Sequence, residues 1–290
     1  MKPLVLARSR GRLLRIPWSC CKQLLSLVIV FGCLSLCRPC TASEADNASA
    51  TAGAEKKDSA AQPQKIRIAL YKGPGTGGKG PPELIKAFGQ GNAATSITEI
   101  TPAEIRAGAL SNYDVVIFAG GSGSQEAKAI GEGGCEQVRQ FVGDGGGYIG
   151  ICAGAYLATA GYPWSLHIIN AHTLSPKWQR GRAVLKMELT QEGEKIMGGP
   201  KDLEVLYHQG PIVGPAGATN LPSYEPLAYF RTEVASNDTP KGIMINSPAI
   251  FAGTYQKGHV ICISPHPEQT AGLEYIVPKA LHWVTPSARQ

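Results

Sequence analysis

The sequence predicts an α/β domain in which a doubly wound, mostly parallel sheet carries helices on both of its faces. Three observations support this fold class. From Lys65 onward, short apolar segments alternate with helical patterns. The segment Tyr113–Ala119 is almost continuously apolar, as a parallel strand covered on both faces requires. The strand–helix–strand order recurs several times, which favours a doubly wound sheet.

The first half of this region contains the clearest elements. Apolar runs bounded by turn residues predict the strands Ile66–Tyr71, Ser96–Ile100, Tyr113–Ala119 and Gly147–Ile151. Helical patterns predict helices at Pro81–Phe88, from Pro102 onward and at Cys135–Val142. Proline in the first turn starts the first of these helices. The capping box Thr101-Pro102-Ala103-Glu104 starts the second.

The second half has more strand signals than helix signals. Further strands are expected at Ala183–Leu189, Leu203–Tyr207, Leu227–Thr232, Ala249–Tyr255 and His259–Ile263, followed by a terminal helix at Leu273–Val284. The sequence has no internal repeat here and no composition typical of a linker. We therefore expect residues 65–285 to form one domain.

The positive charge of the chain is concentrated in residues 1–42. This segment has seven basic residues and no acidic one, so the net charge of +6 becomes −1 once it is removed. Its basic front, its apolar stretch from Leu24 to Cys37 and its small residues near Ala42 are typical of a signal peptide. We expect cleavage near Ala42, a flexible linker over residues 43–64, and export to a periplasm or outside the cell.

An uncleaved N-terminal membrane anchor is the alternative interpretation of the leader. Its apolar stretch is shorter than the roughly 20 residues that a spanning helix needs, so we expect no stable membrane span after cleavage. The remaining chain has no clustered basic face, and nucleic acid is therefore not expected as a partner. A small-molecule or peptide substrate is expected instead, and the sequence identifies no protein partner.

The cysteines divide in the same way as the charge. Five of the eight lie in the leader, which leaves Cys135, Cys152 and Cys262 in the predicted domain. Three cysteines are too few, and odd in number, for a disulfide scaffold. At least one thiol should therefore stay free in the exported protein.

Cys152 lies in the strongest local motif, Gly150-Ile151-Cys152-Ala153-Gly154, directly after a predicted strand. A strand that runs into Gly-x-Cys-x-Gly and then into small helix-forming residues is typical of a nucleophile elbow. The glycines give room at the sharp turn, and the start of the following helix favours the thiolate. The backbone N–H of Ala153 is then available for an oxyanion hole. A buried structural cysteine at a tight turn is the alternative.

A thiolate nucleophile needs a base, and His266 is the best placed of the six histidines. An apolar strand ends just before His266, and ligands bind at the carboxyl ends of parallel strands. Glu268 follows two residues later and, in extended backbone, points the same way as His266. It can therefore orient the imidazole ring. A polar surface loop is the alternative for an isolated His-Pro-Glu sequence.

These motifs resemble the class I glutamine amidotransferase superfamily, in which Gly-Ile-Cys-Ala-Gly is followed by His-Pro-Glu. Three stretches resemble more narrowly the family named for the N-terminal domain of eukaryotic biotin–protein ligase. They are Tyr71–Gly75, Phe118–Gly123 and Gly145–Tyr156. The resemblance covers about residues 65–285 and implies a flavodoxin-like fold with the triad Cys152, His266 and Glu268. It also implies that the backbone N–H of Gly121 completes the oxyanion hole with Ala153.

The sequence departs from that pattern in two ways. Glutamine amidotransferases usually have Gln four residues after the nucleophile, where this chain has Tyr156. The chain also lacks the Gly-Arg-Gly-Arg-rich segment of the biotin-activating ligase domain outside the leader, so we expect no biotin ligase activity.

The remaining site predictions concern the pocket around the nucleophile. The residues expected to line it are Gly73, Gly75, Ser122, Tyr156, Tyr207 and His208. For His208 a supporting position behind the pocket is an equal alternative. The stretch 73–80 resembles a phosphate loop, but Gly80 stands where a Mg²⁺-binding Ser or Thr is needed. It is therefore expected to form a lip of the cleft, and neither a cofactor nor a metal is predicted.

Three functions fit these residues. The first is a cysteine-dependent amide hydrolase that acts on a small polar molecule or peptide. The second is a binding module that keeps the triad scaffold without turnover. The third is an exported subunit that releases ammonia from glutamine for a partner protein.

Overall fold

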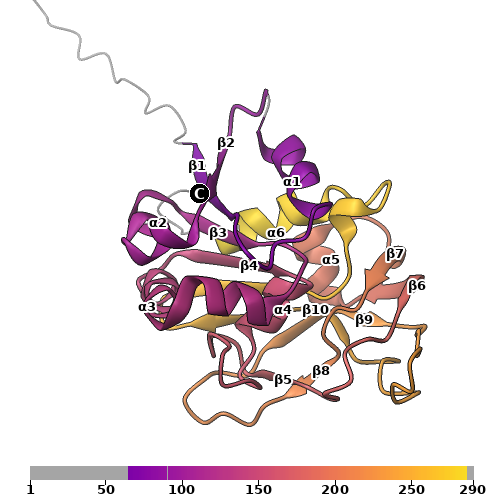
Figure 1. Cartoon of the computed structure of the whole chain (residues 1–290). Helices are drawn as coiled ribbons and strands as arrows, with labels where there is room; N and C mark the ends of the chain where they lie inside the picture. Colours follow the sequence, from indigo (N-terminus) through magenta and orange to yellow (C-terminus); the bar gives the residue numbers. More distant parts are fainter. Residues whose placement is uncertain (1–64, 90, 286–290) are drawn as a thin grey trace, which may run out of the picture. The chain divides into compact units, whose positions relative to one another are not determined.

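The computed structural model describes residues 65–89 and 91–285 (Figure 1). The predicted signal peptide and the predicted linker lie outside the described residues. Within the described part of the chain, no helix combines the length and the apolar character needed to span a bilayer.

One nine-stranded sheet forms the centre of the described region, with the strand order β2-β1-β3-β4-β11-β10-β9-β6-β7. Its strands are β1 (Ile66–Tyr71), β2 (Thr95–Ile100), β3 (Val115–Phe118), β4 (Gly147–Ile151), β6 (Arg182–Leu189), β7 (Asp202–His208), β9 (Glu225–Phe230), β10 (Pro248–Tyr255) and β11 (Gly258–Ile263). The first five strands in the order are parallel, and the last four extend the sheet in antiparallel pairs. Two short strands, β5 (Ala171–Thr173) and β8 (Val213–Pro215), pair separately.

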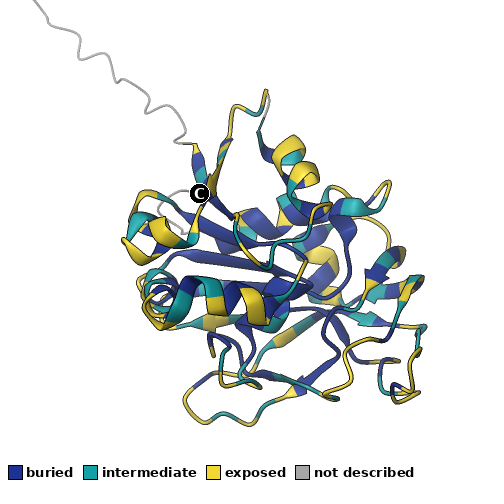
Figure 2. Ribbon diagram, in the orientation of Figure 1, coloured by how far each residue is buried: buried dark blue, intermediate teal, exposed yellow. Residues whose placement is uncertain are grey.

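Helices cover both faces of the sheet. They are α1 (Gly80–Phe88), α2 (Pro102–Arg106), α3 (Gly123–Gly143), α4 (Ala153–Ala158), α5 (Gln191–Met197) and α6 (Ile276–Val284), with single 3₁₀ turns at Ala109–Asn112 and Pro267–Gln269. Apolar side chains of α1, α5 and α6 belong to one buried cluster, and those of α2, α3 and α4 to another. Figure 2 shows the parallel strands buried beneath helices whose outer faces are exposed. This arrangement confirms the predicted fold class.

The strongest sequence signals located their elements closely. The predicted bounds of β1 and β4 match the structure residue for residue, and the capping box at Thr101 is present. Helix α3 begins twelve residues earlier than predicted. Gly131 has a φ of +66° inside it, which marks a kink between two helical segments, and the sequence pattern revealed only the second. The short elements α5, β5 and β8 were not predicted.

The parallel register brings three loops to one edge of the sheet. Phe118 of β3 pairs with Gly150 of β4, and Ile151 of β4 pairs with Ile263 of β11. The carboxyl ends of these three neighbouring strands therefore meet at the same edge. The segments that follow them begin at Ala119, Cys152 and Ser264. The candidate site is built from these segments.

Candidate active site

Cys152 occupies the sharp turn between β4 and α4. Its backbone has a φ of +51° and a ψ of −95°, a conformation that non-glycine residues rarely adopt and that costs free energy unless the surroundings impose it. Its N–H donates to the carbonyl oxygen of Ile263 at 2.8 Å, which ties the turn to β11. A Cβ on Gly154 would collide with the carbonyl oxygen of Phe118, so the glycine after the nucleophile is required by packing. This geometry is that of a nucleophile elbow.

His266 and Glu268 form a buried pair at the end of β11. The imidazole Nδ1 and the Oε1 of Glu268 are 2.8 Å apart, and both residues are about 5% exposed. A 3₁₀ turn at Pro267–Gln269 brings the carboxylate back to the ring, so the expected extended backbone is wrong although the contact is present. The backbone N–H of His266 also donates to the carbonyl oxygen of Leu206 on β7. Because Nδ1 faces Glu268, Nε2 is the ring nitrogen left for Cys152.

The protonation of His266 depends on both neighbours. Burial lowers the pKa of His266, but hydrogen bonds with Cys152 and Glu268, together with their charges, outweigh burial and raise it to about 10. The ring is therefore a cation at neutral pH and lies next to the candidate nucleophile. The Cys152 thiol also donates to the carbonyl oxygen of His208 at 3.4 Å.

Gln269 contacts both His266 and Glu268, and the sequence analysis did not predict it. Its side-chain amide donates to Oε1 of Glu268 at 2.9 Å and lies 3.0 Å from Nδ1 of His266. It thereby fixes the oxygen that orients the imidazole. The only available signal was its position directly after Glu268, which is too weak to single out a glutamine.

The loop after β3 packs against a second glycine-rich loop, residues 73–79. Gly77 N–H donates to the carbonyl oxygen of Gly120, and Ser122 N–H donates to that of Gly75. These two bonds flank Gly121, whose own N–H therefore points away from the second loop. Gly121 has a φ of +150°, and a Cβ there would collide with Gly75. Only glycine fits this position.

Neither predicted oxyanion-hole donor, Gly121 or Ala153, uses its N–H group in local backbone pairing. Gly121 N–H is outside the two bonds that flank it, and Ala153 is the first residue of α4, where an N–H has no partner within the helix. The neighbouring Gly120 packs directly on the base. A Cβ on Gly120 would lie 2.6 Å from Cε1 of His266, so this glycine makes room for the ring.

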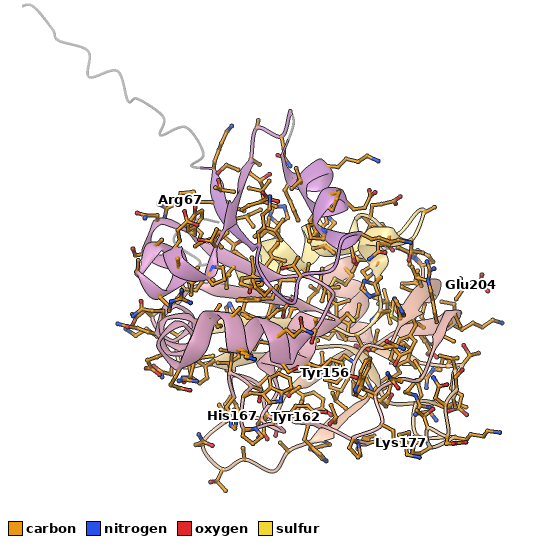
Figure 3. All side chains as sticks on the ribbon, viewed as in Figure 1. Arg67, Tyr156, Tyr162, His167, Lys177 and Glu204 are labelled. Carbon is orange, nitrogen blue, oxygen red and sulfur yellow. The ribbon has the colours of Figure 1, made fainter. Side chains whose placement is uncertain are left out.

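A cavity of about 570 Å³ opens over these groups. Its lining includes the predicted residues Cys152, His266, Gly121, Ser122, Tyr156 and His208. The lip expected over residues 73–80 contributes Gly77, Gly78, Lys79 and Gly80, and Gln209 follows His208 in the lining. The lining also includes residues that were not predicted, namely Tyr162, Trp164, Pro176, Trp178 and Gln269. Tyr156 and Tyr162 lie side by side on its aromatic wall, with ring centroids 6.3 Å apart (Figure 3).

Three of the residues expected to line the pocket lie behind its wall. Tyr207 is fully buried, and its hydroxyl donates to the carbonyl oxygen of Gly210 at 2.7 Å. Gly73 packs against the Tyr71 hydroxyl, and Gly75 packs against Glu126. Gly73 and Gly75 are absent from the lining because the end of the second loop, residues 77–79, faces the cavity instead of its beginning. Tyr207 is absent because its side chain is buried in the core.

His208 does line the cavity, in agreement with one of its two interpretations. Burial holds the pKa of His208 below its usual value, and the positive charges of His266, Arg182 and Lys79 lower it further. His208 is therefore neutral at neutral pH, in contrast to His266.

The other two described cysteines differ from Cys152. Cys135 and Cys262 are free and buried, and burial raises the pKa of both thiols. Neither residue lines the cavity. Among residues 65–89 and 91–285, no group of three or more His, Cys, Asp or Glu side chains has the arrangement of a metal site.

Residues 66–170 match the family model described as "Biotin-protein ligase, N terminal". The matched span contains β1 to β4, Gly121 and Cys152, and it ends before His266. This match agrees with the resemblance inferred from the motifs. A search of curated proteins found no match.

Solved structures with low sequence identity have a similar fold. PurLQS from Thermotoga maritima matches with a TM-score of 0.54 and 13% identity, over 77% of this chain and 100% of that chain. A protein described as thua-like, from Bacteroides uniformis, matches with a TM-score of 0.53 and 15% identity, over 78% of this chain and 93% of that chain. At these identities the likeness shows the fold, and it confirms the predicted flavodoxin-like, glutamine amidotransferase-like architecture.

Proposed function

We propose that the chain is an exported, cysteine-dependent amide hydrolase that acts on a small polar molecule or peptide. One observation carries the proposal. His266 is paired with Glu268 and lines the same cavity as Cys152, and the two neighbours raise the pKa of its ring to about 10. A cationic imidazole beside a cysteine favours the thiolate and supplies the proton that an amine leaving group needs.

Acylation would proceed in one addition and one elimination. The Cys152 thiolate attacks the substrate carbonyl carbon, and the carbonyl oxygen becomes an oxyanion held by the N–H groups of Gly121 and Ala153. The carbon–nitrogen bond then breaks. His266 donates its Nε2 proton to the departing nitrogen, which leaves as an amine and leaves a thioester on Cys152.

Deacylation would use the same groups in reverse. The now neutral His266 takes a proton from water, and the hydroxide attacks the thioester carbonyl. The carbon–sulfur bond breaks, the acid product leaves, and the thiolate is restored beside a cationic ring. Glu268 holds Nδ1–H throughout, which keeps Nε2 directed at the reacting atoms.

Tyr156 argues against glutamine as the substrate. Its hydroxyl donates to the backbone carbonyl of Gln209 at 3.2 Å, and its ring forms part of the cavity wall. A subunit that supplies ammonia would release it from glutamine. The test is to measure ammonia release from glutamine by this protein, alone and together with copurified proteins, and a positive result would favour the ammonia-supplying function. We expect no ammonia release.

The alternative function is a binding module without turnover, and one contact favours it. The Cys152 thiol donates to the carbonyl oxygen of His208, a position in which the sulfur is engaged rather than poised for attack. In such a module the same cavity would hold a ligand, and the reactivity of Cys152 would not depend on His266.

Export remains part of the proposal because the basic and apolar leader supports it. N-terminal sequencing of the protein recovered from the periplasm or the medium is expected to give a chain that begins near Ser43. A chain retained in the membrane with Met1 intact would favour the anchor instead.

A thioester-forming cysteine can be tested without knowing the natural substrate. p-Nitrophenyl acetate is expected to give a burst of about one p-nitrophenol per chain, because the acetyl group stays on Cys152 after the phenolate leaves. Cys152→Ala should abolish the burst. Cys135→Ala is the matched control, since Cys135 is a buried thiol outside the cavity, and it should keep the burst.

Two results would contradict the proposal. A burst that survives Cys152→Ala would assign the acyl group to another residue. The absence of any burst in a protein that binds ligands at the cavity would favour the binding module.

A further inference from the structure

Apart from Cys152 and the tyrosines, the ionisable side chains that line the cavity are all basic. Lys79, His208 and His266 are its titratable side chains other than Cys152 and the tyrosines, and its described lining contains no Asp or Glu. Of these three, His266 is paired with the Glu268 carboxylate at 2.8 Å, and His208 is neutral at neutral pH. Lys79 therefore gives the cavity an uncompensated positive charge.

Arg180 adds a second positive charge behind the same wall. It is only 2% exposed, and its Nε and Nη1 have no hydrogen-bond partner. Its Nη2 lies 3.5 Å from Oε2 of Glu233, whose carboxylate also accepts from the backbone N–H of Gly242. A buried guanidinium with two unpartnered nitrogens is costly unless an anion approaches it.

The charge of Arg180 acts close to the cavity. It opposes the effect of burial on the pKa values of Tyr156 and Tyr207. Its backbone N–H donates to the carbonyl oxygen of Trp178, and both Trp178 and Tyr156 line the cavity. The low dielectric of the interior strengthens the field of such a charge.

Flat rings form the rest of this wall. Tyr162 and Trp164 stack with centroids 4.7 Å apart and planes 14° apart, and Trp178 is 49% exposed although it lines the cavity. Stacked and partly exposed aromatic faces bind flat or ring-shaped groups, and indole N–H groups can donate at the edge.

We propose that the substrate of this site carries an anionic oxygen group, a carboxylate or a phosphate, together with a flat ring. Lys79 and the buried Arg180 select the anion, and the Tyr162–Trp164–Trp178 wall holds the ring. The inference rests on the proposed function because Cys152 is taken as the group that meets the substrate. It goes further by defining which class of amide or ester can be bound.

Comparing a negatively charged alkylating agent with a neutral one tests whether the site prefers anions. The rates at which iodoacetate and iodoacetamide modify Cys152 are measured by peptide mass spectrometry, and their ratio is divided by the same ratio for N-acetylcysteine. We expect the normalised ratio to favour iodoacetate by about tenfold or more at low salt, because a basic cleft concentrates anions. Lys79→Gln should lower this preference several-fold.

Lys177→Gln is the matched control for Lys79→Gln. Lys177 lies between two lining residues, Pro176 and Trp178, but does not line the cavity itself, and its Nζ donates to the backbone of Asp238. Its replacement should leave the preference unchanged. Arg180→Gln should lower the preference further, but its burial can compromise folding, so the exposed Lys79 decides the result.

Protection of Cys152 tests the second part. 3-Phenylpropanoate should slow alkylation by iodoacetamide at lower concentration than either 3-phenylpropanamide, which lacks the charge, or hexanoate, which lacks the ring. Equal protection by acid and amide, together with a normalised alkylation ratio near one, would overturn the anionic substrate class. Equal protection by hexanoate would overturn the ring.

Failure of this inference differs from failure of the proposed function. Fast, His266-dependent alkylation with no preference for charge or ring keeps the hydrolase and removes the substrate class. Charge preference and protection without any p-nitrophenol burst keep the binding preference and remove the hydrolase.

Discussion

The two halves of the described chain contribute to the candidate site in different ways. Residues 66–170 supply Cys152 and the glycine loops that surround it, and a Cβ added at Gly120, Gly121 or Gly154 would collide with backbone atoms or with the His266 ring. Residues 171–285 supply His266, Glu268 and the Trp178 side of the cavity, all through side chains held on loops. The matched family model covers the first of these two regions.

We infer that the first region mainly determines the proposed reaction and that the second contributes more to the choice of substrate. The proposed nucleophile and its proposed oxyanion donors depend on main-chain geometry, which tolerates little change. Much of the wall that faces the substrate depends on side chains, which can change without altering the sheet. Substitutions in the two halves should therefore have effects of different kinds.

The largest expected effect comes from the glycine loop of the first half. Gly121→Ala should reduce the p-nitrophenol burst rate by about 10²–10³, because an added Cβ collides with Gly75 and displaces an oxyanion donor. Gly133→Ala is the matched control, since a Cβ there meets nothing within 4 Å, and it should keep the wild-type rate. Equal rates for both variants would break the comparison.

His266→Asn tests the contribution of the second half to the chemistry. Acylation by an anilide substrate should slow by about 10²–10⁴, because the leaving nitrogen loses its proton donor. In the wild type, anilide acylation should fall as the pH rises through about 10, where His266 loses its proton. His259→Asn, near the opposite end of β11, should leave both the rate and the pH profile unchanged. A His266→Asn variant with wild-type rates would remove His266 from the mechanism.

Trp178→Ala tests whether the second region contributes to substrate binding. The KM for a p-nitrophenyl ester of an aromatic acid should rise about tenfold, because one stacking face is lost. The burst amplitude with p-nitrophenyl acetate should stay the same, since Trp178 is half exposed and belongs to the cavity wall, outside the predicted triad. Loss of the acetate burst would show that the wall also shapes the nucleophile.

Replacing Glu126, in the first region, should change only the stability of the fold, and by a smaller amount. Both of its carboxylate oxygens are buried without partners, and burial raises its pKa well above the ordinary value. The folded chain thus keeps a proton that the unfolded chain loses, so stability falls as the pH rises above about 4.3. Glu126→Gln should remove this loss, which amounts to at most about 1.4 kcal/mol per pH unit.

Urea unfolding of the wild type and Glu126→Gln at pH 5, 6 and 7 measures this difference. The gap in the free energy of unfolding should widen with pH in favour of the variant, while the alkylation rate of Cys152 stays the same. A gap that does not change with pH would contradict the assignment of a neutral, buried carboxyl.

The sequence predicted the parts of the site that local rules determine. Strand β4 and the glycines around Cys152 follow from the elbow, which requires a strand, a sharp turn and a helix in succession. His266 and Glu268 were predicted from a strand end, and their contact is present although the turn that makes it is a different one. The roles of these residues remain predictions.

The sequence could not predict the wall of the cavity, because distant segments form it. Trp178 and Trp164 carry no local signal of a binding role, and the cavity lies where their loops meet those after β1 and β3. Gly73 and Gly75 were expected in the lining, but the packing of Gly121 against Gly75 turns a later part of that loop toward the cavity. The domain boundaries and the exported location also remain predictions.

The most direct test of the account is the rate at which iodoacetamide alkylates Cys152 at pH 6, in the wild type and in His266→Asn. The Cys152 thiol is buried in both proteins, so the ratio of their alkylation rates isolates the effect of the His266 ring. A cationic His266 stabilises the thiolate, and the wild type should therefore react about tenfold faster or more. Equal rates in the two proteins would contradict a nucleophile activated by His266.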